Sequence, residues 1–264
     1  MTDNAAQLAS PSYRLAVEDQ DFLRRDEARA LRFAMEYEKA ELALREWGVR
    51  STVVVFGSAR IPEAATPGAP AAHLAPWYAK AREFARIVSQ RGGALAPDGR
   101  LRDNVIATGG GPGIMAAANR GAAEAGAPSI GFNVSLPHEQ EPNPWSTPAL
   151  TFRFHYFAMR KMHFAMRANA LAVFPGGFGT FDELFEVLTL LQTRKAPPVA
   201  VVLFGRDYWT EVVNFEALAR HGMVDAADLA LFGLVDEPEE GWAWLLAHGL
   251  RAHTPADEAM AEEG

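Results

Sequence analysis

Short apolar runs alternate along this chain with longer stretches in which apolar residues recur at helical spacing. The runs are rich in β-branched residues and are typical of buried strands: TVVVF (52–56), NVIAT (104–108), SIGFNVSLP (129–137), ALAVF (170–174) and PVAVVLF (198–204). The helical spacing predicts helices over 18–47, 77–91, an Ala-rich segment after Gly113, 152–168, 180–192 and 208–221. We therefore expect an α/β fold, a Rossmann-like doubly wound and mostly parallel sheet with helices on both faces.

The length of 264 residues favours one domain. We assign residues 18–250 to a single domain with an N-terminal helix that Gly48 ends. Residues 1–17 are polar and irregular and are expected to be disordered, and the acidic residues 251–264 are expected to form a frayed tail. Pro and Ala fill residues 61–76, which predicts a surface insertion.

Composition excludes several classes of function. The chain has no cysteine, which rules out disulfides and Cys-bound metals and makes the cytoplasm the expected compartment. We expect no membrane contact and no secretory signal, and the net charge of −8 argues weakly against nucleic acid as a partner. His155 and His163 lack metal-ligand spacing and are interpreted as structural histidines, so no metal and no cofactor are predicted.

Glycine turns follow three of the predicted strands, at Gly57, at Gly109–Gly113 and at Gly176–Gly179. The carboxyl ends of parallel strands lie at one edge of a sheet, so these turns can converge. A glycine turn that opens a helix suits a phosphate, because the backbone can approach it and free N–H groups favour negative charge. Neither the dinucleotide fingerprint nor the P-loop pattern is present, which points to a monophosphate; glycines that only make tight turns are the alternative.

Two motifs together resemble those of a known family. GGGPGIM at 109–115 and PGGFGTFDE at 175–183, preceded by Arg160-Lys161, resemble the LOG-type family of cytokinin riboside 5′-monophosphate phosphoribohydrolases, also labelled "possible lysine decarboxylase". The resemblance covers roughly residues 50–250. It implies hydrolysis of the N-glycosidic bond of a nucleoside 5′-monophosphate to a free base and ribose 5-phosphate, by a homodimer or higher homo-oligomer.

The chain also departs from the short plant-like members of that family. It reads FAMRK where they read MHxRK, and it carries an N-terminal helix and extra segments at 61–76 and 94–104. It therefore looks like the longer bacterial branch. AMP or another purine nucleotide is at least as good a candidate substrate as a cytokinin nucleotide.

The resemblance implies catalytic roles for Glu183 and Arg160. A carboxylate can stabilise the oxocarbenium-like sugar and orient the attacking water, and a guanidinium can orient the substrate. Residues Thr180 to Glu183 also fit a capping box, with Thr180 at the N-cap and Glu183 at N3, where the helix dipole would favour the ionised carboxylate. Lys161 lies about 100° from Arg160 on a helix and is expected to make different contacts.

The remaining candidates are substrate-binding residues, each with an ordinary structural alternative. Ser58 either binds phosphate or completes a turn. The full set is Gly57, Ser58, Gly109, Gly110, Gly111, Gly113, Glu139, Lys161, Gly176, Gly177, Phe178, Gly179, Thr180, Phe181, Asp182 and Thr189.

Two rival functions stay open at this point. A decarboxylase that uses pyridoxal phosphate would need a Schiff-base lysine, for which Lys161 and Lys195 are available without a recognisable context. A nucleotide or cofactor carrier could use the same sheet and turns without turnover, although the presence of both Arg160 and Glu183 favours hydrolysis.

Overall fold

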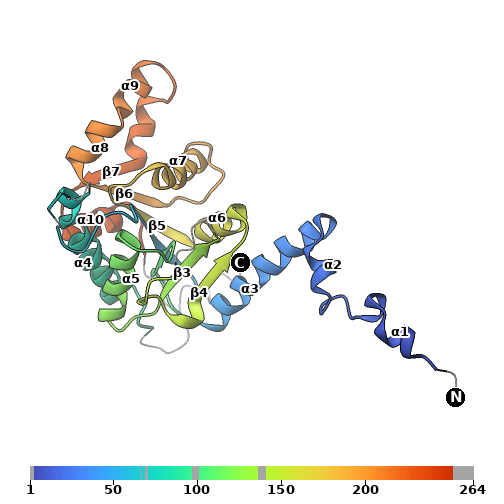
Figure 1. The fold of residues 1–264 in the computed structure, drawn as a ribbon. Coiled ribbons are helices and arrows are strands. Elements are labelled where there is room, and N and C mark those ends of the chain that lie inside the picture. Colours follow the sequence, from blue (N-terminus) through green and yellow to red (C-terminus); the bar gives the residue numbers. More distant parts are fainter. Residues whose placement is uncertain (1–2, 66, 69–70, 97–100, 136–140, 252–264) are drawn as a thin grey trace, which may run out of the picture.

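The described residues form one seven-stranded sheet with helices on both faces (Figure 1). The computed structural model describes residues 3–251, except 66, 69–70, 97–100 and 136–140. All neighbouring strands are parallel, in the order β4-β3-β2-β1-β5-β6-β7. Their bounds are β1 Thr52–Phe56, β2 Val105–Thr108, β3 Ser129–Val134, β4 Thr151–Phe154, β5 Ala168–Val173, β6 Ala200–Phe204 and β7 Phe232–Val235. The predicted Rossmann-like α/β fold is confirmed.

Two apolar cores lie on opposite faces of the sheet. One core contains Val53 and Val55 of β1 and the inner faces of α4 (Pro76–Arg91), α5 (Ile114–Glu124) and α10 (Pro238–Ala247). The other contains Val54 and Phe56 of the same strand and is covered by α3 (Arg29–Glu46), α6 (Phe157–Met166), α7 (Phe178–Gln192) and α8 (Arg206–Val212). Alternate residues of β1 thus enter different cores, which explains why all five of its residues are buried.

The N-terminal segment projects from the body of the molecule as an arm (Figure 1). It contains α1 (Ala5–Ala9), a 3₁₀ helix η1 (Pro11–Tyr13) and α2 (Gln20–Arg24). The prediction of a single helix over 18–47 is wrong, because a 3₁₀ helix η2 (Asp26–Ala28) separates α2 from α3. Gly48 does follow the end of α3, in the left-handed conformation with φ 66°.

The C-terminal half differs from the predicted pattern in two places. Residues 152–154, predicted as helix, belong to β4, where buried Phe152 and Phe154 alternate with exposed Arg153. The helix predicted over 208–221 is divided into α8 and α9 (Phe215–Arg220), because the Asn214 side chain accepts the N–H of Ala217 and caps a new helix.

Three shorter features complete the fold. The Pro/Ala segment contains η3 (Ala72–Leu74), and Leu74 packs against the core, so this segment is more than a surface insertion. The remaining 3₁₀ helices are η4 (Pro148–Leu150) and η5 (Ala226–Leu231). Over the described ranges, every helix is too short or too polar to cross a membrane. Apart from Arg251, the predicted acidic tail lies outside the described residues.

Candidate functional site

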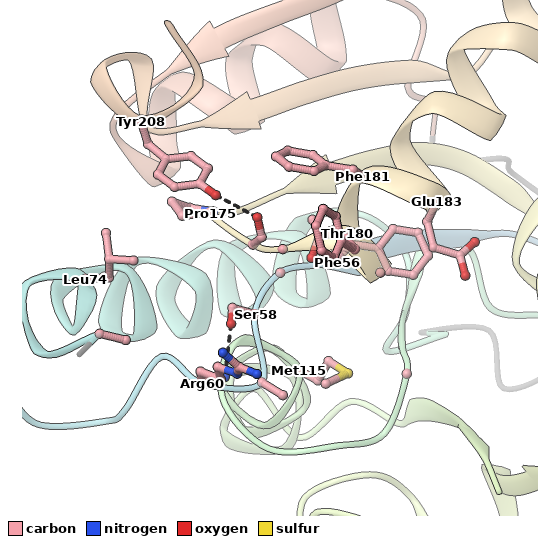
Figure 2. Close-up of a pocket in the computed structure, with 18 of the residues that line it drawn as sticks. Phe56, Ser58, Arg60, Leu74, Met115, Pro175, Thr180, Phe181, Glu183 and Tyr208 are labelled. Atoms are coloured by element: carbon pink, nitrogen blue, oxygen red, sulfur yellow. Dashed lines mark hydrogen bonds between the residues drawn. The ribbon is translucent and has the colours of Figure 1, made fainter. Parts of the chain in front are cut away.

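A cavity of about 720 Å³ lies at the carboxyl ends of β1, β2 and β5 (Figure 2). All three predicted glycine turns contribute to its wall, through Gly57 and Ser58, through Gly109, and through residues 175–180. Arg160 of α6 and Glu183 of α7 line the same cavity. The structure therefore brings the principal candidates of the two motifs to one place, although they are far apart in the sequence.

The turns after β1 and β2 are in direct contact. The N–H of Ile114, the first residue of α5, donates a hydrogen bond of 3.2 Å to the carbonyl of Ser58. A Cβ at Gly113 would lie 2.3 Å from that carbonyl oxygen, and Gly113 has φ 66°, so only glycine fits. Gly110 and Gly111 likewise serve the loop, since their carbonyls accept the backbone and side-chain N–H groups of Asn143. Gly109 is the member of this cluster that lines the cavity.

Helix α7 begins three residues earlier than the predicted capping box requires. Its N-cap is Gly177 and its first residue is Phe178, so Thr180 is the third helical residue and Glu183 lies in the second turn. The predicted capping box is wrong: the N–H of Thr180 donates to the carbonyl of Gly177. A Cβ at Gly176 would lie 2.1 Å from Thr180 Oγ1, so this turn also needs glycine.

The start of α7 offers donors to an anion. The first N–H groups of a helix, here those of Phe178 and Gly179, have no partner within the helix. Gly177, Phe178, Gly179 and Thr180 all line the cavity. The Phe178 ring stands 91% exposed at the cavity wall, and Phe181 lines it more deeply.

Glu183 is 5% exposed and is flanked by two cations from α6. Arg160 Nη2 donates a 3.1 Å hydrogen bond to Glu183 Oε1, and Lys161 Nζ lies 3.7 Å from Oε2. Lys161 also contacts Asp182 at 2.8 Å and Glu186 at 2.7 Å. The expectation that Arg160 and Lys161 make different contacts is thus only partly right, because both reach Glu183.

Burial has the largest effect on the pKa of the Glu183 carboxyl group. Burial raises its pKa, the charges of Lys161 and Arg160 lower it by less, and Glu186 and Asp182 add to the rise. The net shift raises the pKa of Glu183 above its ordinary value. The prediction that Glu183 lies in the first turn, where the helix dipole favours the ionised carboxylate, is wrong: the residue lies in the second turn, and burial raises its pKa.

At Lys161, the interactions with neighbouring carboxylates have a larger combined effect on the pKa than burial does. Burial lowers its pKa, but hydrogen bonds to Asp182 and Glu186 and the charge of Glu183 outweigh this, so the pKa is raised. Its amine is therefore held in the charged form, as an ion-pair partner of Glu183.

Some predicted contacts fall away from the cavity. Asp182 and Thr189 line a separate surface cleft on the outer side of α7, and Thr189 Oγ1 donates to the carbonyl of Phe185. Ser58 lines the cavity, but its Oγ accepts the N–H of Arg60 and so completes the turn as well. Glu139 lies outside the described residues.

The two histidines do not form a metal site. His163 is 1% exposed and stacks against Tyr37 at 5.5 Å, and burial lowers its pKa. His155 is exposed. In the part of the chain that the structure describes, no group of three or more His, Asp or Glu residues is placed to hold a metal ion.

Sequence reasoning missed several residues of the cavity. The Tyr208 hydroxyl donates a 2.6 Å hydrogen bond to the carbonyl of Gly176 and so fixes the third glycine turn (Figure 2). Its position just after the β6 run was the available signal, because that is again a strand's carboxyl end. Leu74 and Arg60 also line the cavity, and neither belongs to a motif that marks it.

Fold and cavity together define a doubly wound α/β protein whose glycine turns meet at the carboxyl ends of the central strands. Residues 115–245 match the family described as "Possible lysine decarboxylase", and the chain belongs to this family through that domain. This is the LOG-type family that the motifs indicate. No curated protein matches the sequence.

Solved structures with a similar fold have low sequence identity. TM1055, a structural-genomics target, is 20% identical over 75% of this chain and 99% of its own, with a TM-score of 0.51. The molybdenum cofactor binding protein of Rippkaea orientalis is 19% identical over 75% and 96%, with a TM-score of 0.46. The Moco carrier protein of Chlamydomonas reinhardtii is 21% identical over 75% and 99%, with a TM-score of 0.45. At these identities TM1055 supports the fold alone.

Proposed function

We propose that this protein hydrolyses the N-glycosidic bond of a nucleoside 5′-monophosphate, AMP or a cytokinin riboside 5′-monophosphate, to the free base and ribose 5-phosphate. The observation that carries the proposal is the buried Arg160–Glu183 pair in the wall of a cavity built from glycine turns. Family membership agrees with it.

The glycine turns would bind the 5′-phosphate. The helix start at Phe178 and Gly179 supplies N–H donors and the positive end of the α7 dipole. Gly57 and Gly109 allow the anion to approach the backbone of the neighbouring turns. This anchoring would leave the ribose to extend along the cavity toward Glu183.

Glu183 would act on the sugar and on water. As the C1′–N bond breaks, an ionised carboxylate stabilises positive charge at C1′ and accepts a proton from the attacking water, whose oxygen forms the new bond to C1′. The leaving base takes up a proton in turn. A carboxylate whose pKa is raised by burial is a better base than an exposed one, and Arg160 and Lys161 restrain the rise.

Incubation with AMP, GMP, CMP and isopentenyl-AMP tests the proposal. Free base and ribose 5-phosphate should appear with at least one of them, by chromatography and a phosphosugar assay. Tight binding of a nucleotide without cleavage would instead support the carrier function.

The family's older label raises pyridoxal phosphate as a cofactor, and the residues present do not fit it. Schiff-base chemistry needs a neutral lysine amine, whereas the pKa of Lys161 is raised by its carboxylate partners. Among the described residues that line the main cavity there is no lysine, and Lys195 lies beyond the far end of α7. A pyridoxal absorbance band in the purified protein would contradict this.

We also infer a homodimer or a higher homo-oligomer. Large apolar side chains of α6 and α7 are exposed on the described surface: Met162 (38%), Met166 (46%), Phe178 (91%) and Phe185 (37%). Size-exclusion chromatography with light scattering gives the mass, and a monomer at micromolar concentration would contradict the inference.

A further inference from the structure

The helix that carries Arg160 and Lys161 is held at its start by a residue from another helix. Tyr156 is the N-cap of α6 and makes no side-chain cap of its own. Instead, Glu36 of α3 accepts two backbone hydrogen bonds there, from His155 to Oε1 at 2.8 Å and from Tyr156 to Oε2 at 3.2 Å. One carboxylate thus fixes two successive N–H groups that lead into α6.

The same face of α3 also holds the Tyr156 side chain. Arg32 Nε donates to the Tyr156 hydroxyl at 2.9 Å, and the Phe33 ring packs edge-on against the Tyr156 ring at 4.4 Å. Inside α6, the carbonyl of Tyr156 accepts the N–H of Arg160 at 3.3 Å. The contacts therefore run from α3 through Tyr156 to the backbone of Arg160.

The Arg160 guanidinium depends on this backbone position. Its Nη2 bonds to Glu183, but its buried Nε has no hydrogen-bond partner among the described residues. The guanidinium otherwise lies over the rings of Phe157 and Phe164, at 5.0 and 5.8 Å from their centroids. Such apolar contacts permit sliding, so a small displacement of the α6 start would change the distance from Arg160 to Glu183.

We propose that Glu36 is a positioning residue for the site: by holding the N–H groups of His155 and Tyr156, it sets the start of α6 and hence the place of Arg160 against Glu183. This inference rests on the proposed function for its kinetic consequences. Its geometric part, the link from Glu36 to the Arg160–Glu183 pair, can be tested without turnover.

The charges around Glu183 supply a readout specific to positioning. Arg160 and Lys161 face it from α6, and Asp182 and Glu186 from its own helix. If the α6 start loosens, the two cations move away while the two acids stay. The pKa of Glu183 should then rise further, and the acidic limb of the pH–rate profile should move to higher pH.

The experiment compares Glu36→Ala and Glu36→Gln with Glu38→Gln, which changes an exposed glutamate of the same helix. With AMP, we expect kcat to fall about 10- to 100-fold for Glu36→Ala, in line with the effect of misplacing a catalytic group. Glu36→Gln should lose less, since its amide oxygen can still accept one N–H. Glu38→Gln should match the wild type in kcat and pH profile.

Two results would overturn positioning. One is Glu36→Ala with unchanged kcat and pH profile. The other is a loss of activity that merely follows the folded fraction, measured by thermal melting, while the acidic limb stays in place.

A second measurement separates this inference from the proposed function. The Glu183 carboxyl is titrated by ¹³C NMR in glutamate-labelled protein, with its signal assigned by Glu183→Gln. A higher titration midpoint in Glu36→Ala supports positioning even if no nucleotide is cleaved, in which case only the proposed reaction fails. An unmoved midpoint overturns positioning whatever the substrate.

Discussion

Two buried glutamates of this protein, Glu41 and Glu183, are nearly equal in exposure, 4% and 5%, and each faces an arginine. Glu41 receives two hydrogen bonds from Arg167, at 2.8 and 2.7 Å, and a third from Arg45 at 2.7 Å. Glu183 receives one from Arg160, at 3.1 Å. The hydrogen bonds from Arg167 hold the pKa of Glu41 below its ordinary value, whereas burial raises that of Glu183.

The difference shows that two carboxyl groups of nearly equal burial can have pKa shifts of opposite direction. Glu41 is saturated with donors and ties α3 to Arg167 just before β5, so its charge is stabilised in place. Glu183 lies beside a cavity and accepts one side-chain hydrogen bond, from Arg160. Its desolvation is therefore not fully compensated, and its pKa is raised. Such an arrangement is typical of functional sites.

The largest expected effect on stability is that of Glu41→Ala. It leaves the Arg167 side chain, 12% exposed, without its main partner, and breaking a buried pair costs about 3–5 kcal/mol. Urea denaturation measures the loss, and turnover per folded molecule should be retained. A loss below about 1 kcal/mol, the range of exposed pairs, would contradict the comparison.

The largest expected effect on activity is that of Glu183→Gln. Glutamine keeps an acceptor for Arg160 but removes the charge, so turnover of the cleaved nucleotide should fall about 10²–10³-fold. The melting temperature should not decrease, because a desolvated charge is removed. Normal turnover per folded molecule in this variant would remove Glu183 from the mechanism.

The contributions of Glu183 and Glu41 to the free energy of unfolding should change in opposite directions as the pH rises. The pKa of Glu183 in the folded state is raised above its ordinary value of 4.5, so its contribution is favourable below that pH and is lost as the pH rises. The melting temperature of Glu183→Gln relative to wild type should therefore increase between pH 4 and pH 7. The pKa of Glu41 is lowered, so its stabilisation is lost on acidification, and the penalty of Glu41→Ala should shrink below pH 4.5. Parallel curves for the two variants would refute this.

The smallest expected effect is that of Arg45→Met. Arg45 bonds Glu41 from one turn away on α3, but its side chain is 70% exposed, so the loss should be about 0.3–0.5 kcal/mol. Chemical denaturation beside the Glu41→Ala variant measures it. A loss comparable to that of Glu41→Ala would show that Arg167 is not the main partner.

Central strands could be predicted from the sequence, and edge strands could not. β1, β2, β3, β5 and β6 each contain at least four successive buried residues, because both faces of the sheet are covered there. β4 has only four residues, TFRF, with a half-buried pattern that is too short to distinguish from a helix start. β7, FGLV, was missed for the same reason.

The sequence predicts which residues meet at the candidate site, but it does not predict their geometry. The motifs point to Arg160 and Glu183, and in the structure Arg160 Nη2 lies 3.1 Å from Glu183 Oε1. The start of α7 could not be read locally, because Gly177 lets the helix begin before Thr180, the residue with the better capping propensity. The direction of the Glu183 pKa shift could not be predicted either, because it depends on burial by elements that are distant in the sequence. Glu36 contacts residues about 120 positions away and gives no local signal.

The place of β1 in the sheet also bears on synthesis. β1 pairs with β2 on one edge and with β5 on the other, so one edge of this fully buried TVVVF strand has no partner until residue 173 has left the ribosome. At about 5–20 residues per second, that interval lasts on the order of ten seconds. Throughout it this apolar segment lacks its β5 partner, and unpaired apolar strand edges are the kind of surface that promotes aggregation of incompletely folded chains.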